Sequence, residues 1–157
     1  MSKVALWKKV YPVPLEMSPG KLCRLAYPGH LHGCPNFGKK EGCPPEAKYL
    51  EVLMNLSSMY VIWNVFPFGE HVQRMRLKHP KWSERQVRCC LYWQGTARKQ
   101  LRERVNDFLS EHSGMGVVWC PEASGLNVTE TMAKIGGVLE WPPETVAYQV
   151  VIAGVLK

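Results

Sequence analysis

The sequence lacks long hydrophobic runs and the common enzyme signatures. No apolar run approaches the roughly 18–20 residues that a membrane-spanning helix needs. The N-terminal residues MSKVALWKKVYPVP contain no apolar core followed by small residues, so we expect no signal peptide and a cytoplasmic location. A Gly-rich phosphate loop, an HExxH motif and a GxSxG motif are absent, as are internal repeats. These absences argue against a membrane protein and against the enzyme classes that those motifs define.

Acidic residues are few, and the basic ones cluster. The chain has 20 Lys and Arg against 13 Asp and Glu, which gives a net charge of +7. The basic segment 74–104 alone carries +8, with only Glu84 and Glu103 to oppose its cations. Such a segment attracts phosphates, so we expect a nucleic acid or an anionic small molecule as partner, although a solvated helix face is the simpler interpretation. Three of its cations are our candidate anion-binding residues: Arg85, Arg88 and Arg98.

Length and hydrophobic pattern predict a single α/β domain over residues 1–157. A chain of this length with 46% hydrophobic residues can bury a sizeable core. Residues 1–45 are rich in Cys, Pro and Gly, and we expect them to form a loop arm. We expect residues 46–157 to form the α/β core, a small, mostly buried sheet with helices packed on it. We expect helices over 45–56, 70–78, 82–111 and 128–135 (capped by Asn127) and strands over 59–66, 115–119 and 145–156.

The predicted helix 82–111 has one apolar face. Apolar residues recur at spacings of three and four, which is typical of an amphipathic helix. Cys90 falls on this face, and Cys89 points about 100° away. Within Tyr92-Trp93-Gln94 the aromatic rings could stack a nucleobase, but packing in the core is the favoured interpretation.

Three of the six cysteines stand in a segment without helical or strand period. The stretch LCRLAYPGHLHGCPNFGKKEGCPP contains Cys23, Cys34 and Cys43 among prolines and glycines. In a reducing compartment these cysteines favour metal binding or catalysis over disulfides. Irregular backbone can wrap round a thiolate-bound metal and offer N–H groups to the sulfurs. Three unrelated buried thiols are the alternative.

The motif CPNFGKKEGCPP resembles the signature of an uncharacterised family of predicted metal-binding proteins. Members carry Cys-Pro-Asn-Tyr/Phe-Gly-Lys followed, at the same spacing, by Cys-Pro-Pro. HPKWSERQVRCCLYWQGTARKQLR and PEASGLNVTETMAKIGGVLEWPP are similar to the central helix and C-terminal section of such proteins, so the resemblance covers most of residues 20–157. It implies that the loop cysteines hold a metal, in particular a [4Fe–4S] cluster.

The chain departs from the family pattern in two places. Many members have a cysteine four residues before the one that matches Cys34, where this chain has His30 and offers Cys23 further back. Many also have additional cysteines before the PEA segment, where this chain has only Cys120. We expect Cys90 as the fourth ligand, because a buried helix thiol beside the loop would complete a four-thiolate site. Cys89, Cys120, His30 and His32 stay open as alternatives.

Three functional hypotheses follow from the sequence. In the first, the chain is an iron–sulfur protein with Cys23, Cys34, Cys43 and Cys90 as ligands. If only three cysteines bind, an open iron could act on an anionic or sulfur-containing substrate. The second hypothesis is a zinc-stapled nucleic-acid-binding module, and the third is a small electron-transfer protein. Thiolates bind zinc and iron–sulfur clusters alike, so the sequence does not choose between the metals.

Overall fold

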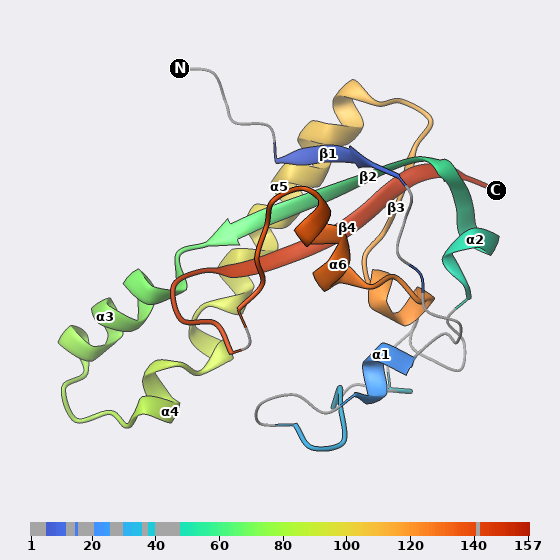
Figure 1. Ribbon diagram of the computed structural model, residues 1–157. Helices are drawn as coiled ribbons and strands as arrows, with labels where there is room; N and C mark the ends of the chain where they lie inside the picture. Colours follow the sequence, from blue (N-terminus) through green and yellow to red (C-terminus); the bar gives the residue numbers. More distant parts are fainter. Residues whose placement is uncertain are drawn as a thin grey trace.

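The computed structural model describes residues 6–11, 15, 21–25, 30–35, 38–39, 48–140 and 142–157. Their strands form one antiparallel sheet in the order β1-β2-β4-β3 (Figure 1). The strands are β1 (Trp7–Val10), β2 (Met54–Phe66), β3 (Gly116–Val118) and β4 (Ala147–Leu156). Helices accompany this sheet, so the chain is a mixed α/β protein, as predicted.

The helices differ widely in length. α5 (Gln94–Glu111) and α3 (Phe68–Lys78) are the long ones. The others are α1 (Lys21–Arg24), α2 (Leu50–Leu53), α4 (Glu84–Val87), α6 (Val128–Lys134) and the 3-10 helices η1 (Cys90–Tyr92) and η2 (Pro121–Ser124). Among the described residues, no helix has the length and apolar character to cross a membrane.

The ladder between β2 and β4 separates two hydrophobic cores. Its continuous part pairs Met59 with Gly154 at one end and Phe66 with Ala147 at the other, and beyond a register shift Met54 pairs with Leu156. Successive side chains of a strand point to opposite faces, so the paired residues Val61 and Ile152 belong to one core, and Ile62 with its partner Val151 to the other. Both faces of the central pair are therefore covered.

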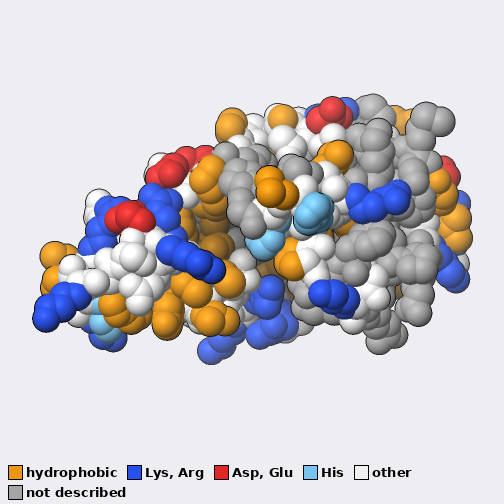
Figure 2. Space-filling view, turned by 90° about the horizontal axis from the view of Figure 1, so that it is seen from below, with side chains coloured by type: hydrophobic (Ala, Val, Ile, Leu, Met, Phe, Trp, Pro, Cys, Tyr) orange, Lys and Arg blue, Asp and Glu red, His pale blue; other side chains and the backbone are white. Residues whose placement is uncertain are grey.

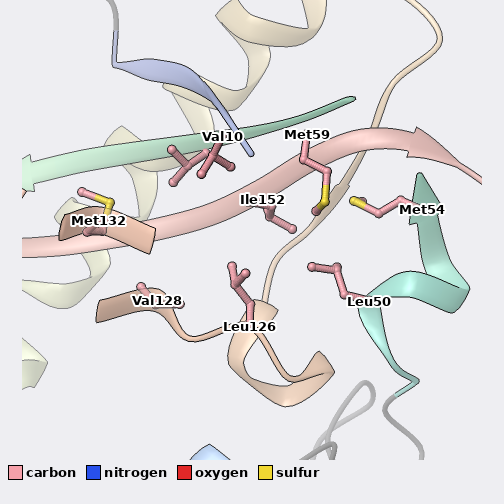
Figure 3. Close-up of a cluster of buried hydrophobic side chains, with 9 residues drawn as sticks. Val10, Leu50, Met54, Met59, Leu126, Val128, Met132 and Ile152 are labelled. Atoms are coloured by element: carbon pink, nitrogen blue, oxygen red, sulfur yellow. The ribbon is translucent and has the colours of Figure 1, made fainter. Parts of the chain in front are cut away.

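Each core is completed by a different set of helices. On the first face, side chains from α2, α6 and the turn before α6 meet those of β1, β2 and β4 (Figure 3). Its most enclosed members include Leu50, Leu126 and Met132, all fully buried, and each contributes about 1.5–3 kcal/mol. On the second face, α5 contributes Leu101, Val105 and Phe108.

A third cluster lies where β2 ends and α3 begins. Phe66 and Phe68 meet Trp93, whose ring stacks on Phe66 with centroids 5.2 Å apart. Val72, Val87 and Ala97 complete the cluster from α3, α4 and α5. The predicted packing of the aromatic pair Tyr92-Trp93 is thus confirmed for Trp93, of whose surface 9% is exposed, but not for Tyr92, which is exposed.

Several predicted elements are confirmed, and two helix predictions are wrong. β4, α3 and α6 lie where predicted, and the Asn127 side chain caps α6 by accepting the Glu130 N–H at 3.0 Å. The helix predicted over 45–56 is helical only over Leu50–Leu53 among its described residues, because the chain enters β2 at Met54 and pairs with the end of β4. Sequence analysis missed β1.

The helix predicted over 82–111 is broken into α4, η1 and α5. Ser83 and Gln86 form a reciprocal capping box that starts α4, but Cys89 is extended, with φ −59° and ψ 129°. The break directs the Trp93 side chain into the third cluster, among Phe66 and Phe68. Packing of this one ring therefore overrides the helical period of the sequence.

His71 is buried in this third cluster without a hydrogen-bond partner for its Nε2 among the described residues. Its ring lies 5.8 Å from that of Phe66 and 6.3 Å from that of Phe68. Burial, with a smaller contribution from the positive charge of Arg74, lowers the pKa of His71. The neutral imidazole is therefore favoured in the folded chain.

We predict that the free energy of unfolding decreases as the pH falls below about 6.5, the pKa of an unfolded His. Below that pH the unfolded chain binds a proton at His71 more readily than the folded chain does. The contribution of His71 to the free energy of unfolding is therefore complete above that pH and is lost as the pH falls. The slope from this residue is at most about 1.4 kcal/mol per pH unit. Denaturant unfolding of the His71→Phe variant between about pH 5 and 8 should give a flatter profile, whereas His32→Phe, at an exposed position, should leave it unchanged. Parallel profiles for His71→Phe and the parent protein would contradict this account.

Candidate functional site

Two of the predicted metal ligands are joined through their backbones. Cys23 lies in α1, and Cys34 follows a tight turn in which the Gly33 N–H donates to the His30 carbonyl at 3.2 Å. The Cys34 N–H then donates to the Cys23 carbonyl at 2.7 Å. Both cysteines are half-buried. The fold therefore brings Cys23 and Cys34 together, although the segment has no regular period.

Only glycine fits between the two cysteines at position 33. Gly33 has φ +83°, a conformation that other residues rarely adopt. A Cβ atom at this position would clash with the Cys23 carbonyl oxygen and lie 2.7 Å from the Arg24 Cα. The turn of residues 30–34 thus rests directly on the backbone of α1.

The third predicted loop ligand, Cys43, lies outside the described residues. The two histidines of the loop are described: His30 is half-buried, and His32 is exposed. In the described part of the chain, no three His, Cys, Asp or Glu side chains are grouped so as to hold a metal ion. No disulfide links the described cysteines to one another. The described residues thus provide two cysteines with adjoining backbones, to which further ligands would have to be added.

Cys120 lies on the segment that packs against α1. The helix that carries Cys23 contacts η2, and Figure 1 shows it beneath the orange turn that includes η2. Cys120 immediately precedes η2 and is exposed. Cys120 thus directly precedes a helix that contacts the helix of Cys23.

The predicted burial of Cys90 on a helix face is wrong. Cys90 begins η1 and is exposed, as is Leu91, of whose surface 83% is accessible. The cause is the break before α5, which turns Trp93 inward and leaves the preceding turn outside. Cys89 is half-buried in the same turn. The argument that made Cys90 the preferred fourth ligand is thereby removed.

Arg88 is tied into the fold. Its guanidinium lies 3.0 Å from a Glu144 carboxylate oxygen and 3.3 Å from one of Glu84, and it donates to the Pro143 carbonyl at 3.3 Å. It also lies 5.7 Å from the centroid of the Phe68 ring. Hydrogen bonding to Glu144 raises the pKa of Arg88. These contacts join α4 to the segment before β4, and they occupy a side chain that we predicted for an anion.

The other two predicted anion-binding residues are exposed. Arg85 makes no ion pair with any described residue. Arg98 donates from Nη2 to the Gln94 side-chain oxygen at 3.3 Å and makes no ion pair in the described ranges. Figure 2 shows Lys and Arg side chains gathered at the α3–α4 end of the molecule, at the left of that view. Of the three predicted anion-binding residues, Arg88 is thus held in ion pairs within the fold, whereas Arg85 and Arg98 make none with the described residues.

Sequence analysis missed a cavity of about 270 Å³ beside the start of α5. It is lined by Trp93 and Gln94, by residues of the 139–148 stretch, and by His30 from the cysteine loop. Glu140 and Tyr148 contribute its carboxylate and its phenol. Only Trp93 and Gln94 carried a sequence signal, because the cavity unites segments that are far apart in the chain and share no motif.

Comparison with models of known protein families, with curated proteins and with solved structures gave no match. The resemblance of CPNFGKKEGCPP to the predicted metal-binding family accordingly stays a prediction.

We predict that Gly33→Ala destroys the hydrogen bond between Cys34 and Cys23. The new methyl group would occupy the space of the Cys23 carbonyl, so the Cys34 amide should exchange with solvent at the rate of an open loop. Gly114→Ala is the matched control, because Gly114 has φ +82° but no atom within 4 Å of an added Cβ. Hydrogen exchange measured residue by residue distinguishes them. Equal protection of the Cys34 amide in the two variants would contradict the close packing of the turn on α1.

We predict that Arg88→Ala lowers the free energy of unfolding by about 1–2 kcal/mol, since it removes two partly exposed ion pairs, a hydrogen bond and a ring contact. Arg85→Ala, a change of the same kind at a position without an ion pair to the described chain, should cost less than about 0.5 kcal/mol. Denaturant unfolding of the two variants tests the difference, and equal losses would show that the Arg88 contacts contribute no stability.

Proposed function

We propose that this chain binds a [4Fe–4S] cluster through the thiolates of Cys23, Cys34 and Cys43, with Cys120 as the fourth ligand. The observation that supports this most is the hydrogen bond from the Cys34 N–H to the Cys23 carbonyl, made beneath Gly33. It brings together the backbones of two cysteines that are eleven positions apart in the sequence. The resemblance of CPNFGKKEGCPP to a metal-binding signature supports the same conclusion.

Cys120 replaces Cys90 in this proposal because of the packing around α1. α1 contacts η2, the helix that Cys120 precedes, whereas Cys90 belongs to the exposed turn between α4 and α5. A ligand can complete a site only if its backbone approaches the other ligands to within the reach of a short side chain. Cys120 is exposed, so its sulfur is not already enclosed in a hydrophobic core.

The charge of the chain suits an anionic centre. Four thiolates around a cluster or a metal ion carry negative charge, which is stabilised by hydrogen bonds to the sulfurs and by nearby cations. The net charge of +7 supplies an excess of cations, and a Gly-rich loop can offer backbone N–H groups to the sulfurs. Zinc bound by the same four thiolates is the alternative, since tetrahedral thiolate sites suit both.

The number of cysteine ligands decides what the centre can do. Held by four cysteines, the cluster would transfer electrons or stabilise the loop; held by three, it would offer a Lewis-acid position to an anionic or sulfur-containing substrate. Of the three predicted anion-binding residues, Arg85 and Arg98 make no ion pair with the described residues and could hold such a substrate.

We predict that Cys34→Ser and Cys43→Ser each abolish bound iron and visible absorption in protein purified without oxygen. Cys120→Ser should lower the iron content or alter the spectrum, because one iron would exchange its ligand. Cys89→Ser and Cys90→Ser are the matched controls and should leave both readouts unchanged.

Two results would count against the proposal. If Cys34→Ser and Cys43→Ser retain the iron and the spectrum of the parent protein, the loop is not the site. If Cys90→Ser changes the spectrum and Cys120→Ser does not, the fourth ligand is Cys90, and the argument from the packing of α1 against η2 fails. Stability is a poor readout here, because loss of any ligand would unfold the loop.

A further inference from the structure

The cavity beside the start of α5 has the size and walls of a site for one planar ring system. Its volume of about 270 Å³ lies just below the range of roughly 300–1,000 Å³ that small-molecule pockets occupy. Leu139, Pro142, Pro143 and the rings of Trp93 and Tyr148 make most of its wall apolar. Apolar and aromatic walls favour an apolar ring system over a charged, flexible chain, because contact with such a ring removes little polar surface from water.

Glu140 gives the cavity a fixed hydrogen-bond acceptor. Its Oε1 accepts from the backbone N–H groups of Val146 and Thr145 at 2.9 and 3.0 Å. These hydrogen bonds lower the pKa of Glu140, so the group is a carboxylate at neutral pH. Both of these bonds end on Oε1, the Glu144 backbone N–H makes a smaller contribution to the lowered pKa, and no hydrogen bond from a described residue to Oε2 is formed. Oε2 can therefore accept from a donor in the cavity. An amino group on a ring is such a donor.

Gln94 adds a polar side chain to the cavity wall, and its hydrogen-bond partner Arg98 is a cation. The Gln94 side-chain oxygen accepts from Arg98, which leaves its NH₂ group to donate to a ring nitrogen or carbonyl. Arg98 is exposed, so its guanidinium lies next to a wall residue of the cavity and remains open to solvent. Glu144, the other acidic residue of this stretch, is ion-paired with Arg88 and does not compete for Arg98.

We propose that this cavity binds the base of a nucleotide that carries an exocyclic amino group, with Glu140 accepting from that amine and Arg98 holding the phosphate. The base would lie between apolar walls that include Trp93 and Tyr148. This inference goes beyond the proposed cluster and does not depend on it, because no cysteine lines the cavity among the described residues. His30, from the turn that ends at Cys34, also lines the cavity, so a bound nucleotide would lie beside the cysteine loop.

Calorimetric titration of the purified chain, residues 1–157, with mononucleotides tests the proposal. GMP and IMP form a matched pair, since they differ only in the exocyclic amine at C2, and GMP should bind at least about tenfold more tightly. Guanosine, without the phosphate, should bind at least about tenfold more weakly than GMP. Iron content is measured on the same samples, so loss of the cluster and loss of nucleotide binding are recorded separately.

Two variants assign the contacts. Glu140→Gln keeps an oxygen for the Val146 and Thr145 amides but replaces Oε2 with an NH₂ group, so the preference for GMP over IMP should disappear. Arg98→Ala should lower the affinity for GMP to that for guanosine. Lys99→Ala is the control for Arg98, because Lys99 is an exposed cation of the same helix that does not contact Gln94.

Three outcomes would overturn the proposal. The first is that none of the amino-bearing nucleotides GMP, AMP and CMP binds. The second is that GMP and IMP bind equally and Glu140→Gln changes neither, which would mean that the base does not enter the cavity. The third is that Arg98→Ala and Lys99→Ala weaken the binding of GMP and of inorganic phosphate to the same extent. That result would show that the ligands bind only through general attraction by the basic segment 74–104.

Discussion

The antiparallel ladder between β2 and β4 is the interaction on which the rest of this structure depends. Its continuous part runs from Met59 and Gly154 to Phe66 and Ala147, and its two rows of side chains bury against different helices. One end of the ladder carries the third cluster, where Trp93 fixes the start of α5 and hence one wall of the cavity. The other face supports the turn before α6 through Leu126, which follows η2. Both candidate sites are therefore positioned by this single pair of strands.

The turn of residues 30–34 connects the two candidate sites. Its first residue, His30, lines the cavity, and its last, Cys34, hydrogen-bonds to Cys23. Gly33 allows the turn to lie directly on α1, because any side chain at that position would meet the backbone of Cys23 and Arg24. In our account, a metal at the cysteines and a nucleotide in the cavity would contact opposite ends of one short turn. Such an arrangement would let the state of one site affect the other.

Sequence alone predicted the elements whose pattern is local. The apolar, β-branched runs 59–66 and 145–156 predicted the two central strands, and Asn127 with Glu130 predicted the start of α6. The sequence could not show that Met54 joins β2, because that depends on pairing with the far end of β4. Nor could it show the break at Cys89, since the cause is the packing of Trp93 on Phe66. The exposure of Cys90 follows from that break.

The candidate sites were predictable to different degrees. Cys23, Cys34 and Cys43 were predicted together as loop ligands from cysteine content and loop composition, and the structure joins the backbones of the first two. The cavity was not predicted, because Glu140, Tyr148 and His30 come from separate segments and meet only in the folded chain. Arg88 was predicted for an anion, yet it pairs with Glu144 and Glu84, and charge pattern alone cannot distinguish a structural cation from a free one.

The central claim is that the loop cysteines hold an iron–sulfur cluster. Iron, acid-labile sulfide and zinc determined per chain, in protein isolated without oxygen, test it most directly. We expect about four irons and four sulfides per chain, the content of one cubane cluster. One zinc per chain without iron or sulfide would contradict the cluster and assign the cysteines to a structural site, and the absence of all three would contradict a metal centre altogether.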